Sequence, residues 1–438
     1  MPSLLTYQTS GRDFLTPRVN AGLLDGMRLG KTRQSLAAAR NLYAKNVLVI
    51  CKASGIANWV REAQEWGFLT QVITSKTTAL IIGTPADPVL YVVSYNAATM
   101  AHVKALLMSH WYTVCIIDEA HYLKNRQSGR TQAVYGKEIN DDGIASRASV
   151  RWILTGTFWP NYPDEVWTHL HALMPATIHY HGNYPMSYWQ FRDRYCKTYD
   201  EKVIGMKNLN DLRTRLKGWT LRRTKEQVWK DTPPMTVSLL PITANMPKLG
   251  EDEARLMAQL EQCETEAELL ATMKRLAPHF ATLRRITGMA KVKGVVDWVS
   301  DNLEQLGKVV LFAHHKEVIA GLGTGCAKFT EVVSITGGLS PTEREARRCR
   351  FMEDDKVGVL VGQNFAAGDS IALHASDTVL LCEPDWTPGQ NDQCLDRVSH
   401  LEKKWGCTGY FVAIPNSADE HLMDVLARKS VENYNRED

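Results

Sequence analysis

The chain has 438 residues, of which 23 % are charged and 44 % are apolar, a balance that predicts a globular protein of two or three domains. The N-terminus lacks the basic-then-apolar layout of a signal peptide, and no apolar run reaches about 18 residues, so we expect no membrane span. The net charge is only +3, and the nine cysteines form no CxxC pair, which predicts reduced cytosolic thiols rather than disulfides or a metal site.

The first informative stretch, residues 23–32, has the pattern of a short apolar strand, a glycine-containing turn and the start of a helix. In such a turn, successive backbone N–H groups point at an anion, and the helix N-terminus adds its dipole. Lys31 can then reach the β- and γ-phosphates of a nucleotide, and the Thr32 hydroxyl can hold Mg²⁺. The strict pattern has glycine five residues before Gly30, where this chain has Asp25. Taken alone, the stretch could also be an ordinary helix cap with an exposed lysine.

A second stretch, residues 113–119, is a β-branched apolar run that ends in two carboxylates, Asp118 and Glu119. A buried parallel strand would deliver both acids to the carboxyl edge of a sheet. Asp118 suits the Mg²⁺ shell, and Glu119 can polarise the attacking water. Two acids after a strand are usually a solvated turn. Because they follow a Gly-Lys-Thr turn, the two stretches together predict a nucleoside triphosphatase.

Short β-rich runs alternate with helical spacing in both halves of the chain. They are residues 47–50, 89–94, 113–117 and 152–154, then 309–312, 332–333, 359–361, 379–381 and 410–412. This alternation predicts an α/β protein with two domains, each a parallel sheet covered on both faces. We expect the first domain at residues 1–232, with a helical and aromatic insertion at about 160–220 that has no obvious buried strand. The second is expected at 233–438, with a helical insertion at about 250–306.

Two further patterns mark this middle part of the chain. Residues 207–230 hold eight Lys or Arg and two acids, which favours contact with a polyanion over a merely solvated helix face. Residues 292–306 place their apolar side chains on one helical face, and Gly307 is positioned to end that helix.

The order of the motifs and their residues resemble those of superfamily-two helicases, and among these the Swi/Snf-type double-stranded DNA translocases. The first lobe carries the resemblance in Asp25–Thr32, Ile50–Ser54, Asn58–Trp59, Asp118–His121, Lys124–Asn125, Arg130–Thr131, Leu154–Thr157 and Leu221–Lys225. The second lobe carries it in Phe312–His315, Ile335–Gly337, Ala366–Gly368, Trp386–Pro388 and Gln393–Arg397. Residues 283–285 and 290–292 look most like the small branch that includes annealing helicases. The match spans nearly the whole chain.

Four residues or motifs depart from the family pattern. Arg28 stands where the family has glycine in the phosphate turn, and Phe158 replaces a proline in the third motif. Motif five is altered at residues 368–373, and motif six ends in His400 instead of a second arginine. The first lobe looks intact, whereas the changes in the second lobe put the rate of hydrolysis in question more than nucleotide binding.

The resemblance implies two RecA-like lobes with an ATP·Mg²⁺ cleft between them. It assigns catalysis to Lys31, Asp118, Glu119 and Arg397, the arginine reaching the transition state when the lobes close. The implied nucleotide-binding residues are Gln8 at the adenine edge, then Asp25, Gly26, Met27, Arg28, Leu29, Gly30, Lys31, Thr32, Gln34, Gly368 and Arg397, with Thr32 and Asp118 as Mg²⁺ ligands. The implied DNA contacts are Lys52, Lys124, Asn125, Arg130, Lys291, His314 and Trp386.

The function implied is an ATP-dependent motor that translocates on double-stranded DNA without obligatory strand separation. Contacts to the phosphodiester backbone carry no sequence information, so tracking would be sequence-independent. A strand-separating DNA or RNA helicase, an ATP-switched DNA clamp with slow turnover and a non-enzymatic recruiter are the alternatives. His400 favours the clamp, and the retained catalytic residues argue against the recruiter. We expect a monomer in the cytoplasm of a bacterium or a virus-infected cell, associated with the nucleoid.

Overall fold

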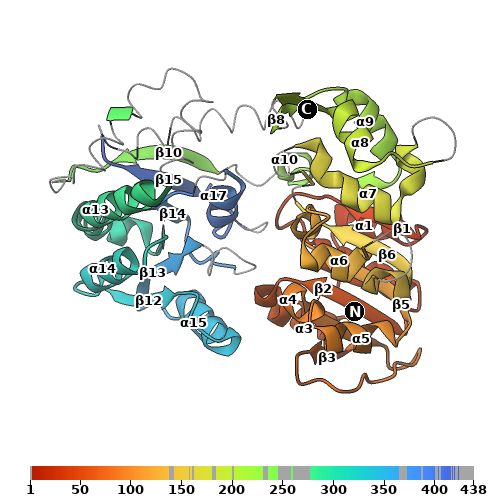
Figure 1. Cartoon of the computed structure of the whole chain (residues 1–438). Coiled ribbons are helices and arrows are strands. Elements are labelled where there is room, and N and C mark those ends of the chain that lie inside the picture. The colour runs from red at the N-terminus through yellow and green to blue at the C-terminus, as the bar shows by residue number, and fades with distance from the viewer. Residues whose placement is uncertain are drawn as a thin grey trace. The chain divides into compact units, whose positions relative to one another are not determined.

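The computed structural model describes residues 2–137, 143–156, 158–159, 162–179, 184–199, 202–229, 235–244, 258–259, 277–364, 372–385, 388–399, 403, 406–415, 417, 419 and 423. The chain divides into two compact units, Met1–Lys230 and Asp231–Asp438 (Figure 1). Among the described residues, no helix is long and apolar enough to cross a membrane.

The first unit is built on a seven-stranded parallel sheet in the order β3-β4-β2-β5-β6-β1-β9. Its strands are β1 (Asn20–Leu23), β2 (Asn46–Cys51), β3 (Leu69–Ile73), β4 (Val89–Ser94), β5 (Tyr112–Asp118), β6 (Ala148–Leu154) and β9 (Thr220–Leu221). The four strands predicted in this half are confirmed. The edge strands β3 and β9 were not predicted, because neither is a continuous apolar run.

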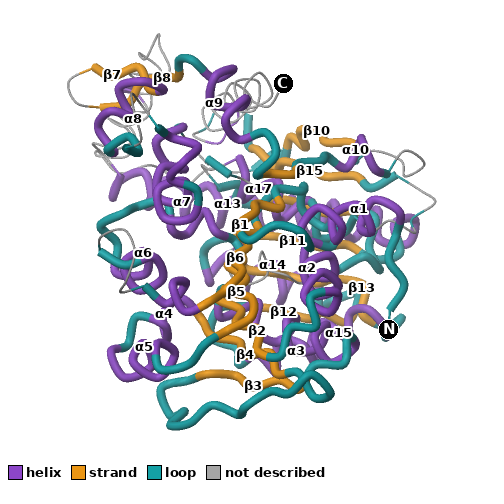
Figure 2. Tube along the Cα trace, turned by 90° about the vertical axis from the view of Figure 1, so that its right-hand side faces the viewer, coloured by secondary structure: helices purple, strands orange, loops and turns teal. Residues whose placement is uncertain are grey.

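Both faces of this sheet are covered, as the apolar runs predicted. Val47 and Val49 of β2 enter one hydrophobic cluster, and Leu48 and Ile50 enter the other. The first cluster packs under α1 (Thr6–Leu15), α2 (Lys31–Asn41) and α3 (Ile56–Glu65). The second packs under α4 (Tyr95–Ala98), α5 (Ala101–Met108) and α6 (Gly129–Tyr135). Figure 2 shows α2 and α3 on one side of the strands and α4, α5 and α6 on the other.

The remaining elements of the first unit are short. The helices are α7 (Trp167–Leu173), α8 (Tyr188–Tyr195), α9 (Leu209–Leu216) and α10 (Lys225–Val228). The 3₁₀ turns are η1 (Ala53–Gly55), η2 (Ala120–Leu123), η3 (Ile144–Arg147), η4 (Pro163–Val166) and η5 (Pro175–Ile178). An antiparallel hairpin, β7 (Cys196–Tyr199) and β8 (Lys202–Met206), lies where the sequence showed no obvious buried strand.

The second unit has a six-stranded parallel sheet in the order β10-β15-β14-β11-β13-β12. Its strands are β10 (Thr236–Pro241), β11 (Val309–Ala313), β12 (Glu331–Ile335), β13 (Val357–Gln363), β14 (Thr378–Leu381) and β15 (Thr408–Ala413), and its helices are α13 (Ala277–Leu306), α14 (Lys316–Cys326), α15 (Pro341–Glu353) and α17 (Pro388–Leu395). Val295 and Val299 of α13 are fully buried, and Gly307 follows the helix with φ +70°. The predicted apolar face and helix stop are therefore confirmed, as are the five predicted strands.

Candidate functional site

The phosphate turn lies between β1 and α2, at the carboxyl edge of the first sheet. Gly30 caps α2 with φ +73°, a left-handed conformation that glycine adopts without steric cost. A Cβ on Gly30 would also lie 2.4 Å from Nε2 of Gln8. The Lys31 ammonium donates to the carbonyls of Asp25 and Gly26 at 2.7 and 3.2 Å. The lysine is thus held at the turn where a nucleotide phosphate is expected.

Arg28 also adopts the left-handed conformation, with φ +64°. For a residue with a side chain this conformation costs roughly 1–2 kcal/mol relative to the right-handed one. Glycine would avoid that cost, which gives a physical reason for the glycine at this place in the family pattern. The departure noted in the sequence therefore strains the backbone of the phosphate turn.

A buried polar network holds the turn from beneath. Asp25 is fully buried and accepts two hydrogen bonds from Arg223, at 2.5 Å from Nη2 and 3.0 Å from Nε. Gln34, also fully buried, donates to Asp25 and to the Leu29 carbonyl and accepts from Arg223 at 2.7 Å. Both side chains thus bond within the protein and shape the turn, and the nucleotide contacts expected of Asp25 and Gln34 stay predictions.

Gln8 lies against this turn from α1. It is 6 % exposed, its Oε1 accepts from the backbone N–H of Leu5, and its Nε2 lies 3.5 Å from the Leu29 carbonyl oxygen. The neighbouring Tyr7 hydroxyl accepts from the Trp229 indole at 3.3 Å. The adenine contact expected of Gln8 stays a prediction. Trp229, which belongs to none of the motifs found in the sequence, is a neighbour that only the structure shows.

The two carboxylates stand at the end of β5, as the sequence predicted. The carboxylate of Asp118 accepts from the indole N–H of Trp59 at 2.8 Å and from the backbone N–H of Glu119 at 3.0 Å. Glu119 adopts φ +51°, and its carboxylate lies 3.3 Å from Nδ1 of His121, which also lies 3.0 Å from the Thr155 hydroxyl. Trp59 and His121 thereby orient the two acids.

The ionisation of the two acids differs. Burial and the neighbouring Glu119 carboxylate raise the pKa of Asp118, although the Trp59 hydrogen bond and the Lys31 charge oppose this. Burial alone would raise the pKa of Glu119, but His121, Lys31 and Lys52 together lower it. Glu119 therefore stays ionised at neutral pH, as a group that polarises water must.

The third motif completes this edge of the sheet. A Cβ on Gly156 would lie 3.3 Å from Cγ of Met27 and 3.7 Å from Nζ of Lys31, so the residues after β6 meet the phosphate turn. Ligands of parallel sheets bind at such carboxyl edges. An ammonium group, a threonine hydroxyl and two carboxylates form a donor set that fits a nucleoside triphosphate with Mg²⁺.

The DNA contacts expected in the first unit lie around η2. Lys52 and Arg130 both lie over the ring of Tyr122. Lys124 pairs with Glu165 at 2.7 Å. The Asn125 side chain accepts from the backbone N–H of Gln127 at 2.9 Å.

In the second unit the structure corrects one expected DNA contact. Lys291 is 1 % exposed, and its ammonium pairs with Asp419 at 3.0 Å and donates to the Val412 carbonyl at 3.2 Å. Its charge is neutralised in the interior, so it does not lie on a surface that DNA could contact. Trp386, Gly368 and His400 lie outside the described residues.

The remaining expected residues of the second unit are His314 and Arg397. Glu383, 3 % exposed, accepts from the backbone N–H groups of His314 and His315 and from the ring of His315 at 2.6 Å. Burial alone would raise the pKa of Glu383, but these hydrogen bonds lower it. Arg397 follows α17, is 8 % exposed and offers its carbonyl to the Leu373 N–H. Glu383 belongs to none of the motifs found in the sequence.

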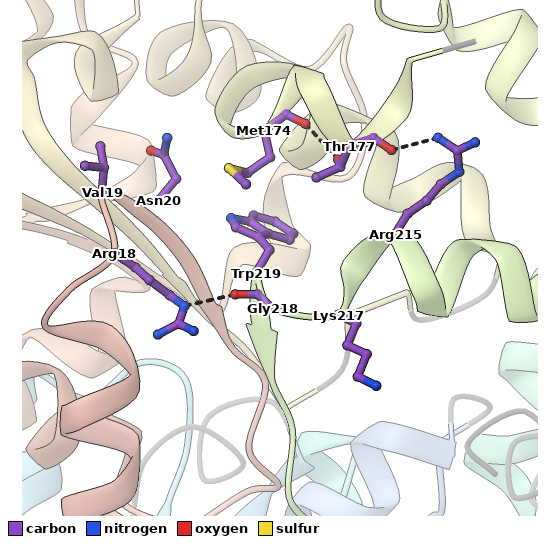
Figure 3. A pocket seen from close by; sticks show the side chains of 9 residues that line it. All are labelled: Arg18, Val19, Asn20, Met174, Thr177, Arg215, Lys217, Gly218 and Trp219. Atoms are coloured by element: carbon purple, nitrogen blue, oxygen red, sulfur yellow. Dashed lines mark hydrogen bonds between the residues drawn. The ribbon is translucent and has the colours of Figure 1, made fainter.

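A pocket of about 350 Å³ lies at the amino ends of β1 and β9 (Figure 3). Trp219 and Met174 line it, with Arg18 bonded to the Gly218 carbonyl and Arg215 bonded to the Thr177 carbonyl at its sides. Because β1 and β9 are parallel, this pocket lies at the sheet edge opposite to the phosphate turn. It is separate from the candidate nucleotide site.

Known proteins resemble the chain along nearly its whole length. The SNF2-related domain matches residues 7–249, and the helicase conserved C-terminal domain matches residues 290–401. The chain is 25 % identical over 452 residues to the SWI/SNF-related matrix-associated actin-dependent regulator of chromatin subfamily A-like protein 1 of Xenopus tropicalis, covering 98 % of this chain and 44 % of that protein. It is 25 % identical over 441 residues to the human DNA annealing helicase and endonuclease ZRANB3, covering 98 % and 40 %.

These coverages mean that the chain spans about two fifths of the length of these relatives. Among solved structures, the Sulfolobus solfataricus SWI2/SNF2 ATPase core in complex with double-stranded DNA matches with a TM-score of 0.47 and 21 % identity, covering 97 % of this chain and 91 % of that one. The SNF2-related domain alone covers more than half of the chain. With two parallel sheets and the family's motifs in order, the chain belongs to the SNF2-related family, with a helicase C-terminal domain in its second half.

Proposed function

We propose that this chain is an ATP-dependent motor that translocates on double-stranded DNA and remodels DNA or protein–DNA complexes without obligatory strand separation. The observation that carries the proposal is the placement of Lys31, Asp118 and Glu119 at one sheet edge, since β1 and β5 both pair in parallel with β6. A cation in a phosphate turn facing two carboxylates is the arrangement that phosphoryl transfer to water requires.

We assign the catalytic roles residue by residue. Lys31 binds the β- and γ-phosphates, and Glu119 orients the attacking water. Thr32 and Asp118 would hold Mg²⁺, which neutralises charge that develops on the phosphates. Asp25 and Gln34 keep the turn in shape through Arg223. Arg397 supplies the cation that stabilises the transition state.

We assign DNA binding to Lys52, Arg130, Lys124 and Asn125 in the first unit and to His314 and Trp386 in the second. Backbone contacts of this kind predict sequence-independent binding. The runner-up functions are a strand-separating helicase and an ATP-switched clamp with slow turnover. Three relatives are named for DNA annealing, so annealing of complementary strands is a further candidate activity. We also propose lobe boundaries at residues 232 and 233, a monomer, and a cytoplasmic, nucleoid-associated location.

The deciding experiment measures ATP hydrolysis with duplex DNA, single-stranded DNA, forked DNA, RNA and no nucleic acid. We expect duplex DNA to stimulate turnover most. Duplex binding should weaken with salt, with a log–log slope near −4 to −5 for about five neutralised phosphates. Glu119→Gln, which keeps the shape of the side chain, is the control for contaminating hydrolysis. Equal stimulation by RNA, or no stimulation by any nucleic acid, would defeat the translocase proposal.

A further inference from the structure

Three residues of the first unit form a cluster beside the candidate magnesium site. Tyr122 lies in η2, three residues after Glu119. Nζ of Lys52 lies 4.6 Å from the centroid of the Tyr122 ring, and Cζ of Arg130 lies 5.6 Å from it. Lys52 precedes η1, and Arg130 belongs to α6. Two cations from separate elements thus share one aromatic ring.

The same ring is connected to the magnesium site. Tyr122 is stacked on Tyr95, with ring centroids 5.9 Å apart and an interplanar angle of 21°. Tyr95 is 4 % exposed, and its hydroxyl donates to the backbone carbonyl of Asp118 at 2.6 Å. A displacement of the Tyr122 ring therefore reaches the backbone of Asp118 through one stacked pair and one hydrogen bond.

A second connection runs from the same surface to the same residue. The turn η1 follows Lys52 and leads directly into α3, which carries Trp59. Trp59 is 1 % exposed and donates to the carboxylate of Asp118 at 2.8 Å. The backbone and the side chain of Asp118 are thus each held by an aromatic residue.

We propose that Tyr122 is a positioning residue through which a bound phosphodiester controls the placement of Asp118. This inference rests on the proposed function, in which Lys52 and Arg130 contact duplex DNA and Asp118 holds Mg²⁺. Two like charges over one ring repel each other, and a phosphate between them neutralises that repulsion. The cations then lie differently over Tyr122, and the stacked Tyr95 transmits the change to Asp118. DNA binding and nucleotide binding are coupled by this route.

Coupling of this kind is reciprocal in binding free energy, so it can be measured without turnover. The Kd for duplex DNA is measured without and with a non-hydrolysable ATP analogue and Mg²⁺. The larger of the two Kd values divided by the smaller is the coupling ratio. We expect Tyr122→Leu to lower this ratio at least about fivefold, within the range typical of coupled sites. The duplex stimulation of ATP hydrolysis should fall in parallel.

Two control variants separate coupling from structural damage. Tyr122→Phe keeps the ring, the stacking and the cation contacts, and it should retain the parental ratio. Tyr188→Leu removes another tyrosine that carries a cation, with Cζ of Arg126 4.8 Å from its ring centroid. In the part of the chain that the structure describes, Tyr188 contacts Asp164, Trp167 and Trp189 rather than Tyr95 or Asp118, so this variant should also retain the ratio.

The outcomes separate this inference from the proposed function. If the parental protein shows no duplex dependence, the proposed function fails. If the parent is stimulated but Tyr122→Leu keeps the parental ratio, the coupling through Tyr122 is overturned. Should Tyr122→Leu not fold, Tyr95→Phe tests the same route, because it removes only the hydroxyl that bonds the Asp118 carbonyl. A parental ratio in Tyr95→Phe would overturn the inference.

Discussion

The ion pair beneath the phosphate turn allows a prediction whose magnitude follows from burial. In Arg223→Met the apolar stem survives, but the fully buried Asp25 loses both of its hydrogen bonds to the guanidinium. Removing one partner of a buried ion pair costs about 3–5 kcal/mol, because the remaining charge is left uncompensated. Gln34 and the Tyr7 carbonyl lose a donor as well. Since these losses share one network, we expect the total to stay at about 3–5 kcal/mol.

Urea unfolding followed by circular dichroism measures this cost. The adjacent Arg222→Met is the matched control, because Arg222 is exposed and its replacement should change the free energy of unfolding by less than about 0.5 kcal/mol. Adding Asp25→Asn to Arg223→Met removes the buried charge. The double variant should therefore be more stable than the sum of the two single losses predicts, by about 0.5–3 kcal/mol.

The same variants report on the site. Because Lys31 donates to the carbonyls of Asp25 and Gly26, a loosened Asp25 should also weaken ATP binding in Arg223→Met. If Arg223→Met unfolds like Arg222→Met, or if the two single losses simply add, the ion pair does not hold the phosphate turn and the reasoning is wrong.

Three further predictions concern catalysis and pH. Lys31→Ala should lose ATP affinity, because it deletes the charge that faces the phosphates. Glu119→Gln should bind ATP without hydrolysing it, and hydrolysis at the parental rate in this variant would make the glutamate merely structural. Arg397→Ala should lower turnover at saturating duplex by roughly 10³-fold or more with ATP binding largely preserved, and unchanged turnover would remove Arg397 from the mechanism. Burial lowers the pKa of His169 to about 3. As the pH falls, the His169 imidazole is therefore protonated in the unfolded chain before it is protonated in the folded one. The stability that depends on neutral His169 is therefore complete above about pH 6.5, and about 2 kcal/mol of it is lost by pH 5. Urea unfolding at pH 7 and pH 5 should show this loss in the parent and not in His169→Gln; equal pH dependence in both would contradict it.

Much of the fold could be predicted from the sequence, because its signals are local. A strand buried on both faces must be apolar at successive positions, and residues 47–50 and 309–312 show this directly. A phosphate turn needs glycine and lysine at fixed spacing, so residues 26–32 can be recognised without a structure. The same holds for the acids after β5 and for the end of α13 at Gly307, where a left-handed residue follows the helix.

Only the tertiary structure decided which polar side chains find a partner within the protein. Arg223 and Asp25 are 198 residues apart in the chain, yet they form the buried pair that shapes the phosphate turn. Lys291 was expected from its motif to contact DNA, whereas in the structure it is the interior ion-pair partner of Asp419. Trp59 reads as a core residue and also orients Asp118. The sequence shows the residue type but not whether solvent, a ligand or a buried partner satisfies its charge or its indole N–H. Only packing brings a buried partner within hydrogen-bonding distance.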